Sequence, residues 1–431
     1  MTQPGTSWGR WPRHAHRLLP LANRFDALPN LAPMLPYGNG RSYGDVCQND
    51  GGTLLLTRGL DRFIAFDPAT GVLDCEAGVL LSEIIDLVLP RGWFPTITPG
   101  TRFVTVGGAI ANDVHGKNHH RAASFGNHVI EFELLRSDGQ VLHCSPTENR
   151  DWFVATIGGL GLTGLIRRVR LQCKRVPGPW IRGDSQRFGN LDEFYAITRE
   201  SDGDYEYTVA WIDCTASGAK LGRGIFTRGN HAPARAVASG GRALRMPLTP
   251  PLSLVNRPSL SAFNTLYFNR AAARADGALW HYRPFFYPLD GILEWNRLYG
   301  PRGFYQYQCA VPEAGAIDAL NEMLRRIGRS GLGSFLVVLK TFGRIPSLGM
   351  MSFPRPGATL ALDFPNRGEK TLALLEALDE ITRSVGGAVY PAKDARMSAA
   401  SFQHYFPAWQ AFGRYVDPQF SSSFWRRVTE V

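Results

Sequence analysis

Residues 99–126, PGTRFVTVGGAIANDVHGKNHHRAASFG, carry the strongest structural signal in this 431-residue chain. The stretch holds five glycines, three histidines and one lysine, and it lacks the regular apolar spacing of a long amphipathic helix. A glycine pair such as Gly107-Gly108 lets backbone N–H groups approach a phosphate or a flat ring, because no Cβ stands in the way. The segment therefore predicts close backbone contact with a ligand.

Two further glycine-rich turns flank this segment. GNGRSYGD lies upstream at residues 38–45, and GGLGLTG lies downstream at residues 158–164. Three such turns in one region predict a large, extended cofactor. The strand, G-x-G-x-x-G and helix unit that binds dinucleotides in a Rossmann fold is not recognisable, so that fold is not expected.

The length of the chain and its patterns predict an α+β protein of two domains. Short β-like runs, a helix at residues 81–89 and a hairpin across residues 129–143 indicate an α+β first domain over residues 1–178. The second domain is expected over residues 179–387, and residues 388–431 are expected to return to the first.

Two strand, helix, strand units, at residues 305–339 and 359–390, characterise the second domain. They predict an antiparallel sheet covered by helices on one face. Residues 217–260 are instead rich in Gly, Pro, Ser, Ala and Arg, and we expect a mobile loop there.

The charge balance favours an anionic partner. Lys and Arg number 47 against 37 Asp and Glu, which gives a formal net charge of +10. No zinc-finger, RNP or basic-zipper pattern appears, so a phosphorylated substrate or an anionic membrane surface is expected rather than nucleic acid. Neither a signal peptide nor a transmembrane run is recognisable, which predicts a cytoplasmic protein or one peripheral at the inner membrane.

The histidines and cysteines are the candidate metal ligands of this chain. Six cysteines are scattered without a C-x-x-C pair, which favours reduced thiols over a zinc ribbon or a disulfide scaffold. His115, His119, His120 and His128 are close in sequence, but no nearby cysteine or helix arranges them on one face. We therefore expect no metal, and we expect His119 and His120 to support the loop.

Several stretches resemble the FAD flavoenzymes of the vanillyl-alcohol-oxidase family, with its PCMH-type FAD-binding fold. The quoted matches are PYGNGRSYGD at residues 36–45, TPGTRFVTVGGAIANDVHGKNHH at 98–120, ATIGGLGLTG at 155–164 and YPAKDAR at 390–396. Further matches, such as AWID at 210–213 and LKTFG at 339–343, continue in the same order over nearly the whole chain. Within the family they are most similar to the branch that oxidises polyprenyl-phosphoryl ribose.

The resemblance implies FAD as the cofactor and a set of residues around it. Backbone N–H groups and the fixed charge of Arg41 in the GNGRS loop suit a pyrophosphate. The implied FAD contacts are Gly38, Asn39, Gly40, Arg41, Ser42, Tyr43, Pro99, Gly100, Thr101, Thr105, Gly107, Gly108, Ala111, Asn112, His115, Gly116, Asn118, Gly161, Gly164, Ile166 and Tyr390. Relatives that attach FAD covalently use the histidine of a GxGHS loop. Arg41 stands at that position here, so FAD is expected to bind non-covalently.

The resemblance also implies a substrate side. Lys393, His115 and Tyr43 are the expected catalytic residues, because a lysine can stabilise a developing alkoxide or bind a hydroxyl or a phosphate. The implied substrate contacts are Lys117, Trp211, Asn296, Gln306, Gln308, Lys340, Asp363 and Lys393. Two positions depart from the actinobacterial pattern, because Ala361 replaces a cysteine and Phe286 a tyrosine.

The implied reaction is oxidation of the 2-hydroxyl of a polyprenyl-phosphoryl ribofuranose to a 2-keto sugar by hydride transfer to flavin N5. A separate NAD(P)H-dependent reductase would complete the epimerisation to arabinose for cell-envelope glycan. The loop at residues 217–260 is the expected contact with the lipid and the membrane. The alternatives are an aldonolactone or alditol oxidase acting on a soluble polyol, and a flavin-less binding protein, against which the intact glycine turns and Lys393 argue.

Overall fold

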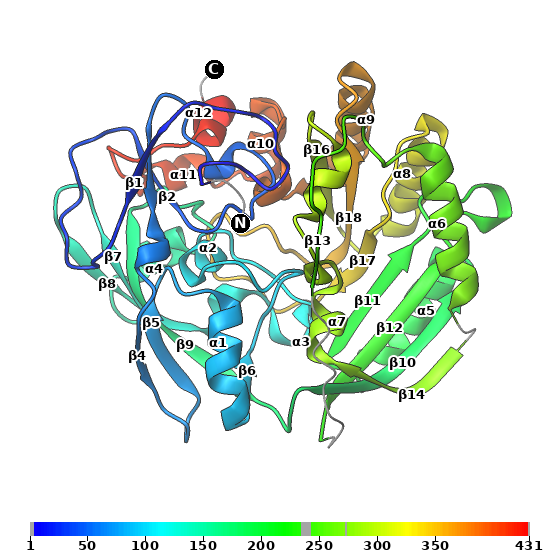
Figure 1. The fold of residues 1–431 in the computed structure, drawn as a ribbon, viewed down its shortest axis with the longest axis horizontal. Helices are drawn as coiled ribbons and strands as arrows, with labels where there is room; N and C mark the ends of the chain where they lie inside the picture. Colours follow the sequence, from blue (N-terminus) through cyan, green and yellow to red (C-terminus); the bar gives the residue numbers. More distant parts are fainter. Residues whose placement is uncertain (1–3, 234–242, 272–273, 430–431) are drawn as a thin grey trace.

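The computed structural model describes residues 4–233, 243–271 and 274–429. Figure 1 shows two halves side by side, each built around its own sheet. Helices and antiparallel sheets occur together throughout, which confirms the α+β class.

The first half contains a parallel three-stranded sheet, β1-β3-β2, and an antiparallel sheet, β4-β5-β9-β7-β8, with β6 on β9. β9 alternates buried and less buried residues, as expected of a strand with one face in the core. The strands are β1 (Arg17–Pro20), β2 (Met34–Tyr37), β3 (Thr53–Leu56), β4 (Phe63–Phe66), β5 (Val72–Glu76), β6 (Trp93–Pro95), β7 (Val129–Leu135), β8 (Val141–Cys144) and β9 (Leu165–Arg175). The helices are α1 (Leu81–Val88), α2 (Val106–Ala111), α3 (His119–Ala122) and α4 (Arg150–Thr156).

The second half is an antiparallel eight-stranded sheet with the order β14-β10-β12-β11-β17-β18-β16-β19. Its strands are β10 (Trp180–Phe188), β11 (Tyr207–Ile212), β12 (Gly224–Ala232), β14 (Arg274–His281), β16 (Phe304–Val311), β17 (Val337–Phe342), β18 (Gly357–Pro365) and β19 (Ala388–Val389). A small pair, β13 (Leu244–Arg245) and β15 (Ile292–Leu293), stands apart from it.

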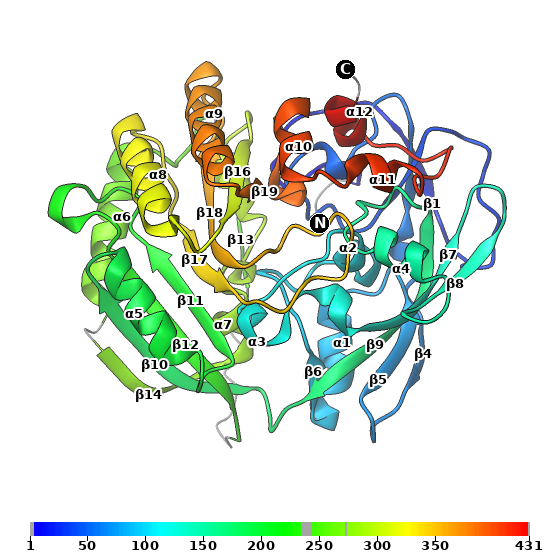
Figure 2. The same ribbon diagram turned by 180° about the vertical axis from the view of Figure 1, so that it is seen from behind.

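Three helices cover one face of this sheet: α5 (Leu191–Ser201), α8 (Ala316–Ser330) and α9 (Glu369–Ser384). They lie in front of the sheet in Figure 2 and behind it in Figure 1. The buried residues of α8 recur every three or four positions, from Ala316 to Ile327, so one stripe of the helix packs on the strands. The helix-covered sheet predicted from the two strand, helix, strand units is confirmed. The other face of the sheet is left for the site.

The expectation of a mobile loop over residues 217–260 is wrong for a large part of it. β12 runs between β10 and β11 inside the sheet, and α6 (Arg257–Arg270) begins before residue 260. Composition misled here because the glycines of β12 serve packing: a Cβ at Gly224 or Gly229 would press on neighbouring strand atoms. Residues 234–242 lie outside the described residues.

The C-terminal segment spans both halves. β19 pairs with β16, and the chain then carries α10 (Ala399–Tyr405), α11 (Trp409–Gly413) and α12 (Ser423–Thr429). Ser423 N donates to Gln48 O, and Met34 bridges to Phe420, so this segment contacts the first half. α7 (Tyr282–Phe286) lies at the junction of the halves (Figure 1).

Candidate active site

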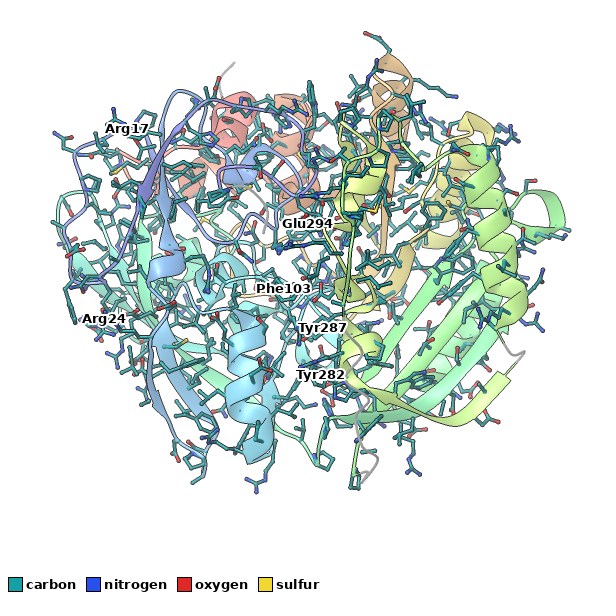
Figure 3. All side chains as sticks on the ribbon, viewed as in Figure 1. Arg17, Arg24, Phe103, Tyr282, Tyr287 and Glu294 are labelled. Atoms are coloured by element: carbon teal, nitrogen blue, oxygen red, sulfur yellow. The ribbon has the colours of Figure 1, made fainter. Side chains whose placement is uncertain are left out.

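A cavity of about 930 Å³ lies between the two halves. All three glycine-rich turns reach it, and the face of the eight-stranded sheet opposite α5, α8 and α9 closes the other side. Figure 3 shows Phe103 from the first half and Tyr287 and Glu294 from the second at this junction. The Tyr287 hydroxyl also lies 2.5 Å from the Thr98 hydroxyl, which joins the two halves beside the cavity.

The turn at residues 38–45 offers its backbone to the cavity. The N–H groups of the four residues 39–42 donate no hydrogen bond to the described part of the protein, and all four residues line the cavity. A Cβ at Gly38 would overlap Thr105 Oγ1, the atom that caps α2 by accepting from Gly108 N. Glycine therefore lets two ligand-facing loops meet. Consecutive free N–H groups of this kind form a nest for an anion such as a pyrophosphate.

Arg41 belongs to this turn and lines the cavity. Its guanidinium stacks over the Trp8 ring at 4.2 Å and lies 5.6 Å from the Phe103 ring. Its buried Nε has no hydrogen-bond partner among the described residues. Burial lowers the pKa of Arg41, but a guanidinium stays protonated at neutral pH. The side chain thus places a fixed positive charge beside the N–H groups.

Asn112 carries a free hydrogen-bond acceptor on the first-half wall of the cavity. The Asn112 amide donates to Gly108 O at 2.9 Å, and Asn112 O accepts from the Tyr390 hydroxyl at 2.7 Å. The buried Asn112 Oδ1 has no partner within the described residues. Because a buried unsatisfied acceptor is costly, this oxygen suits a ligand that brings a donor, such as a flavin ring.

Lys393 and Tyr43 meet at the cavity. Lys393 Nζ lies 4.0 Å from the centre of the Tyr43 ring, and Tyr43 N donates to Ala392 O at 2.9 Å. Burial lowers the pKa of Lys393 to about 8, although the Asp363 carboxylate works in the opposite direction. Burial raises the pKa of Asp363 to about 7, against the attraction of Lys393. Both pKa values thus lie close to neutral pH, which is common at functional sites.

Lys340 holds His115 in a fixed orientation. Lys340 Nζ donates to His115 Nδ1 and to Gly116 O, both at 2.8 Å, and the Gln308 amide lies 2.9 Å from His115 Nε2. Burial, followed by the charge of Lys340, lowers the pKa of His115 well below its usual value. His115 is therefore a neutral imidazole at physiological pH. Burial also lowers the pKa of Lys340 to about 7.

Lys117 is the third ammonium of the cavity. Within the described residues its Nζ has no hydrogen-bond partner, and it lies 5.1 Å from the centre of the Phe285 ring. Burial lowers its pKa to about 8. Among the described residues that line the cavity, seven are Lys or Arg and two are Asp or Glu. This excess of positive charge favours an anionic ligand.

The structure brings together nearly all of the predicted site residues. Of the expected FAD contacts, those that line the cavity are Gly38, Asn39, Gly40, Arg41, Ser42, Tyr43, Pro99, Gly100, Thr101, Thr105, Gly107, Gly108, Ala111, Asn112, His115, Gly116, Gly161, Gly164, Ile166 and Tyr390. Of the expected substrate contacts, those that line it are Lys117, Trp211, Gln306, Gln308, Lys340 and Lys393.

Three predicted residues stand behind the cavity wall instead. The Asn118 amide donates to Thr96 O, and the Asn296 amide donates to Trp8 O, both at 2.9 Å. Asp363 accepts from Gln306 Nε2 at 2.9 Å and supports that residue, which does line the cavity. Their side chains serve the protein rather than the surface of the cavity.

Other lining residues were not predicted from the sequence. The group comprises aromatic and arginine side chains at the second-half side of the cavity: Tyr267, Arg270, Trp280, Phe285 and Trp295, with Trp8 from the N-terminal segment. The dense aromatic run HYRPFFYP at residues 281–288 was the available signal. Ala361 and Phe286, the two departures, also line the cavity.

The histidines at residues 115–128 form hydrogen bonds to other protein groups. No group of three or more His, Cys, Asp and Glu in residues 4–233, 243–271 and 274–429 is placed to hold a metal ion. His119 Nδ1 accepts from Gly343 N at 3.2 Å, and His120 Nε2 lies 3.1 Å from Tyr205 O. In the same described ranges no helix is both long and apolar enough to cross a bilayer.

The N–H nest, the fixed charge of Arg41 and the free acceptor of Asn112 fit the pyrophosphate and ring of FAD. The fold and the cavity thus define an FAD-dependent oxidoreductase of the PCMH type.

Comparison with known proteins agrees with this class. Residues 26–145 match the FAD binding domain family. The chain is 38% identical to decaprenylphosphoryl-β-D-ribose oxidase of Mycolicibacterium smegmatis, over 91% of this chain and 88% of that protein. It is 35% identical to an uncharacterised protein of Streptomyces coelicolor, over 81% of this chain and 100% of that protein. Cytokinin dehydrogenase 8 of Oryza sativa subsp. indica is 29% identical, over 43% of this chain and 36% of that protein. The chain belongs to the family of decaprenylphosphoryl-β-D-ribose oxidases.

Proposed function

We propose that this chain oxidises the 2-hydroxyl of a polyprenyl-phosphoryl ribofuranose to the 2-keto sugar with FAD as the oxidant. One observation carries the proposal: a single cavity joins the N–H nest of residues 39–42 to the Lys393–Tyr43 pair and to two further lysines, Lys340 and Lys117. A cofactor and an anionic sugar therefore find their recognition groups in one enclosed space.

FAD supplies the hydride acceptor, at N5, when it is bound. The chain contributes position and charge. Residues 39–42 would hold the pyrophosphate through their N–H groups, and Asn112 Oδ1 would accept a hydrogen bond from the ring. Close placement of the sugar carbon would replace a random encounter and so lower the entropic part of the barrier.

Lys393 acts on the hydroxyl that is oxidised. Its buried ammonium stabilises negative charge that develops on the hydroxyl oxygen, and the low-dielectric surroundings strengthen that effect. Asp363 lies behind Gln306 and balances the charge of Lys393. The charge of Asp363 opposes the effect of burial on the pKa of Lys393 and so favours its protonated form, while the hydroxyl proton leaves to a nearby base or water as the hydride leaves the carbon.

His115 and Lys117 serve the remainder of the substrate. The neutral His115 ring, fixed by Lys340 and Gln308, forms a rigid wall beside the reacting carbon. Lys117 has a free Nζ and is the best-placed cation for the phosphodiester. Its hydrophobic neighbour Phe285 keeps water away from this contact.

FAD is held without a covalent bond in this proposal, because Arg41 stands at the position of the linking histidine and its guanidinium is stacked on Trp8. Denaturing the yellow holoenzyme and removing the protein by filtration tests this. Free flavin in the filtrate supports the proposal, and flavin that stays on the protein overturns it.

The decisive experiment is anaerobic mixing of the holoenzyme with polyprenyl-phosphoryl ribose while the flavin absorbance is followed. We expect rapid bleaching, and no bleaching with the 2-deoxyribose analogue, which lacks the reacting hydroxyl. Bleaching by both would move the reaction to another hydroxyl. Bleaching only by a soluble aldonolactone or alditol would establish the alternative oxidase instead.

The oxidation is the first half of a 2-epimerisation to arabinose for cell-envelope glycan in this proposal. A 2-keto sugar needs a hydride on its opposite face to become the arabinose epimer, so a separate NAD(P)H-dependent reductase is the expected partner. Mixing the enzyme, its substrate, NADPH and a candidate reductase should give the arabinose epimer. Recovery of the keto sugar alone would contradict this step for that reductase.

A further inference from the structure

The loop that carries His115 and Lys117 fills an opening in the eight-stranded sheet. β11 and β17 have six residues each, and they pair through residues 210–211 of the first and 338–339 of the second. This described pairing stops short of the start of β11 and the end of β17, and α3 lies beside that end of β17 (Figure 2). Residues 115–121, which we call the wedge loop, occupy the opening.

Both strands approach the backbone of the wedge loop closely. On the β11 side, Thr208 N donates to Lys117 O at 3.0 Å. On the β17 side, Gly343 directly follows the strand, and a Cβ at this position would stand 2.5 Å from His120 Cα. Glycine is therefore required where the loop meets β17. Contacts on both sides fix the loop in the sheet.

The wedge loop also runs antiparallel to the segment that leads into β11. His120 Nε2 lies 3.1 Å from Tyr205 O. One residue further along the loop, Arg121 Nη2 donates to Gly203 O at 2.6 Å. As the loop advances, its partners therefore come earlier in the chain. Glu206 belongs to this segment and directly precedes β11.

Glu206 is bound to two groups of the first half. Its Oε1 accepts from Asn118 Nδ2, an atom of the wedge loop, at 3.4 Å. Its carboxylate also accepts from Lys174 Nζ, at the end of β9. The side chains of Lys174 and Glu206 are only 18% and 25% exposed, so solvent screens this ion pair little. Glu206 thus connects the second half with the wedge loop and with the strand that leads out of the first half.

These contacts determine where Lys117 stands. Lys117 lines the cavity, whereas the next side chain, that of Asn118, is held behind the wall by Thr96 O and Glu206. Lys117 Nζ has no hydrogen-bond partner within the described residues. Its position in the cavity is therefore set by the backbone of the wedge loop rather than by a contact of its own.

We propose that Glu206 is a positioning residue for the phosphorylated part of the substrate. By binding Asn118 and Lys174 it holds the wedge loop in the sheet, and so it keeps Lys117 Nζ where the phosphodiester binds. The proposal rests on the proposed function, because Lys117 is assigned to the phosphodiester there. Glu206 is not among the described residues that line the cavity, so its effect on binding must pass through Lys117.

The first test compares Glu206→Ala and Glu206→Gln with the wild-type holoenzyme on a water-soluble, short-chain polyprenyl-phosphoryl ribose. We expect Glu206→Ala to raise KM about tenfold and to leave kcat within about twofold, because Lys393 lies on another loop. Glu206→Gln keeps an acceptor for Asn118 and should give an intermediate KM. Glu380→Ala, at a carboxylate that is 60% exposed, is the matched control and should behave as the wild type.

A double-mutant cycle separates positioning from a general loss of structure. In the Lys117→Met background, Glu206→Ala should no longer raise KM, because the group that it positions is absent. A neutral alkyl riboside, which lacks the phosphodiester, should inhibit the wild type and Glu206→Ala equally. An unchanged KM in Glu206→Ala overturns the proposal. A rise that persists without Lys117, or weaker inhibition by the neutral riboside, overturns it too, since either result indicates a merely structural role.

The reactivity of the Lys117 amine tests the positioning without any substrate. Burial lowers the pKa of Lys117 to about 8, and release of the wedge loop would return this pKa toward about 10.4, the ordinary value for lysine. Competitive acetylation followed by mass spectrometry should place the midpoint of Lys117 labelling about 1 to 2 pH units higher in Glu206→Ala. Equal midpoints overturn the positioning role even if the flavin bleaches normally. Absence of bleaching in the wild type contradicts the proposed function, whereas the shifted midpoint would still support the positioning of Lys117.

Discussion

The two walls of the cavity are built in different ways. The first-half wall presents backbone from three glycine-rich turns, and the second-half wall presents side chains from the eight-stranded sheet and its loops. A backbone wall needs glycine wherever two loops meet, as Gly38 shows against Thr105. A side-chain wall can be assembled from single residues far apart in sequence. The first-half wall, which we call the cofactor wall, can therefore be recognised from a sequence motif. The second-half wall, which we call the substrate wall, cannot.

Removing the ammonium of Lys393 should have the largest effect. It should slow the reaction at the side-chain wall without changing the binding of FAD at the backbone wall. We expect Lys393→Met to slow flavin bleaching by about 100-fold to 1000-fold, because a buried charge that stabilises the reacting oxygen is lost. The absorbance of bound FAD should remain. Anaerobic stopped-flow spectroscopy measures the rate, with Lys370→Met at an exposed position as the control. An unchanged rate would remove Lys393 from the chemistry.

Disrupting the backbone wall should instead weaken the binding of FAD. Gly38→Val would place side-chain atoms against Thr105 Oγ1 and separate the two loops. We expect FAD affinity to fall by about 100-fold, since this displacement disturbs the N–H nest. Titration of the apoprotein with FAD measures it. Gly203→Ala, where a Cβ meets open space, should bind FAD normally, and equal affinity for both variants would refute a backbone role.

Arg427 of α12 tests how the two walls are joined. It pairs with Asp45 at 2.8 Å and with Asp394 at 3.0 Å, and so connects the loop of Tyr43 with the loop of Lys393. Arg427→Met leaves two buried carboxylates without their partner, which should cost about 3 kcal/mol of unfolding free energy. Chemical denaturation measures this. Arg414→Met, on an exposed side chain, should leave stability unchanged.

The smallest expected effect concerns the pH dependence of anion binding. Burial sets the pKa of Lys117 at about 8 in the free protein, and an anion stabilises its protonated form. Binding of the sugar phosphodiester should therefore weaken by about tenfold as the pH rises from about 7 to about 9. Lys117→Met should bind more weakly at pH 7 and show a flatter profile. Isothermal titration at both pH values checks this, and a parallel profile in the variant would assign the titration to another group.

The sequence predicted the cofactor wall and missed part of the substrate wall for a physical reason. Glycines at 38, 107 and 161 mark required backbone geometry, so their motif identifies the cavity directly. Tyr267 and Trp280 reach the cavity only because β14 and α6 are placed there by tertiary packing. The composition of residues 217–260 resembles a loop, but strand pairing on both sides of β12 overrides it. Asn118 and Asn296 were predicted to contact the ligand because a motif match does not distinguish a residue that lines the cavity from one that supports the lining residues.

The contact between Tyr43 N and Ala392 O joins residues almost 350 positions apart. Half of the reacting centre is therefore missing until residues 391–429 have docked on the first half. Cofactor retention then reports whether the chain has been assembled correctly. A protein nicked between Tyr390 and α12 should release its flavin and lose its colour before it loses most of its helices and strands.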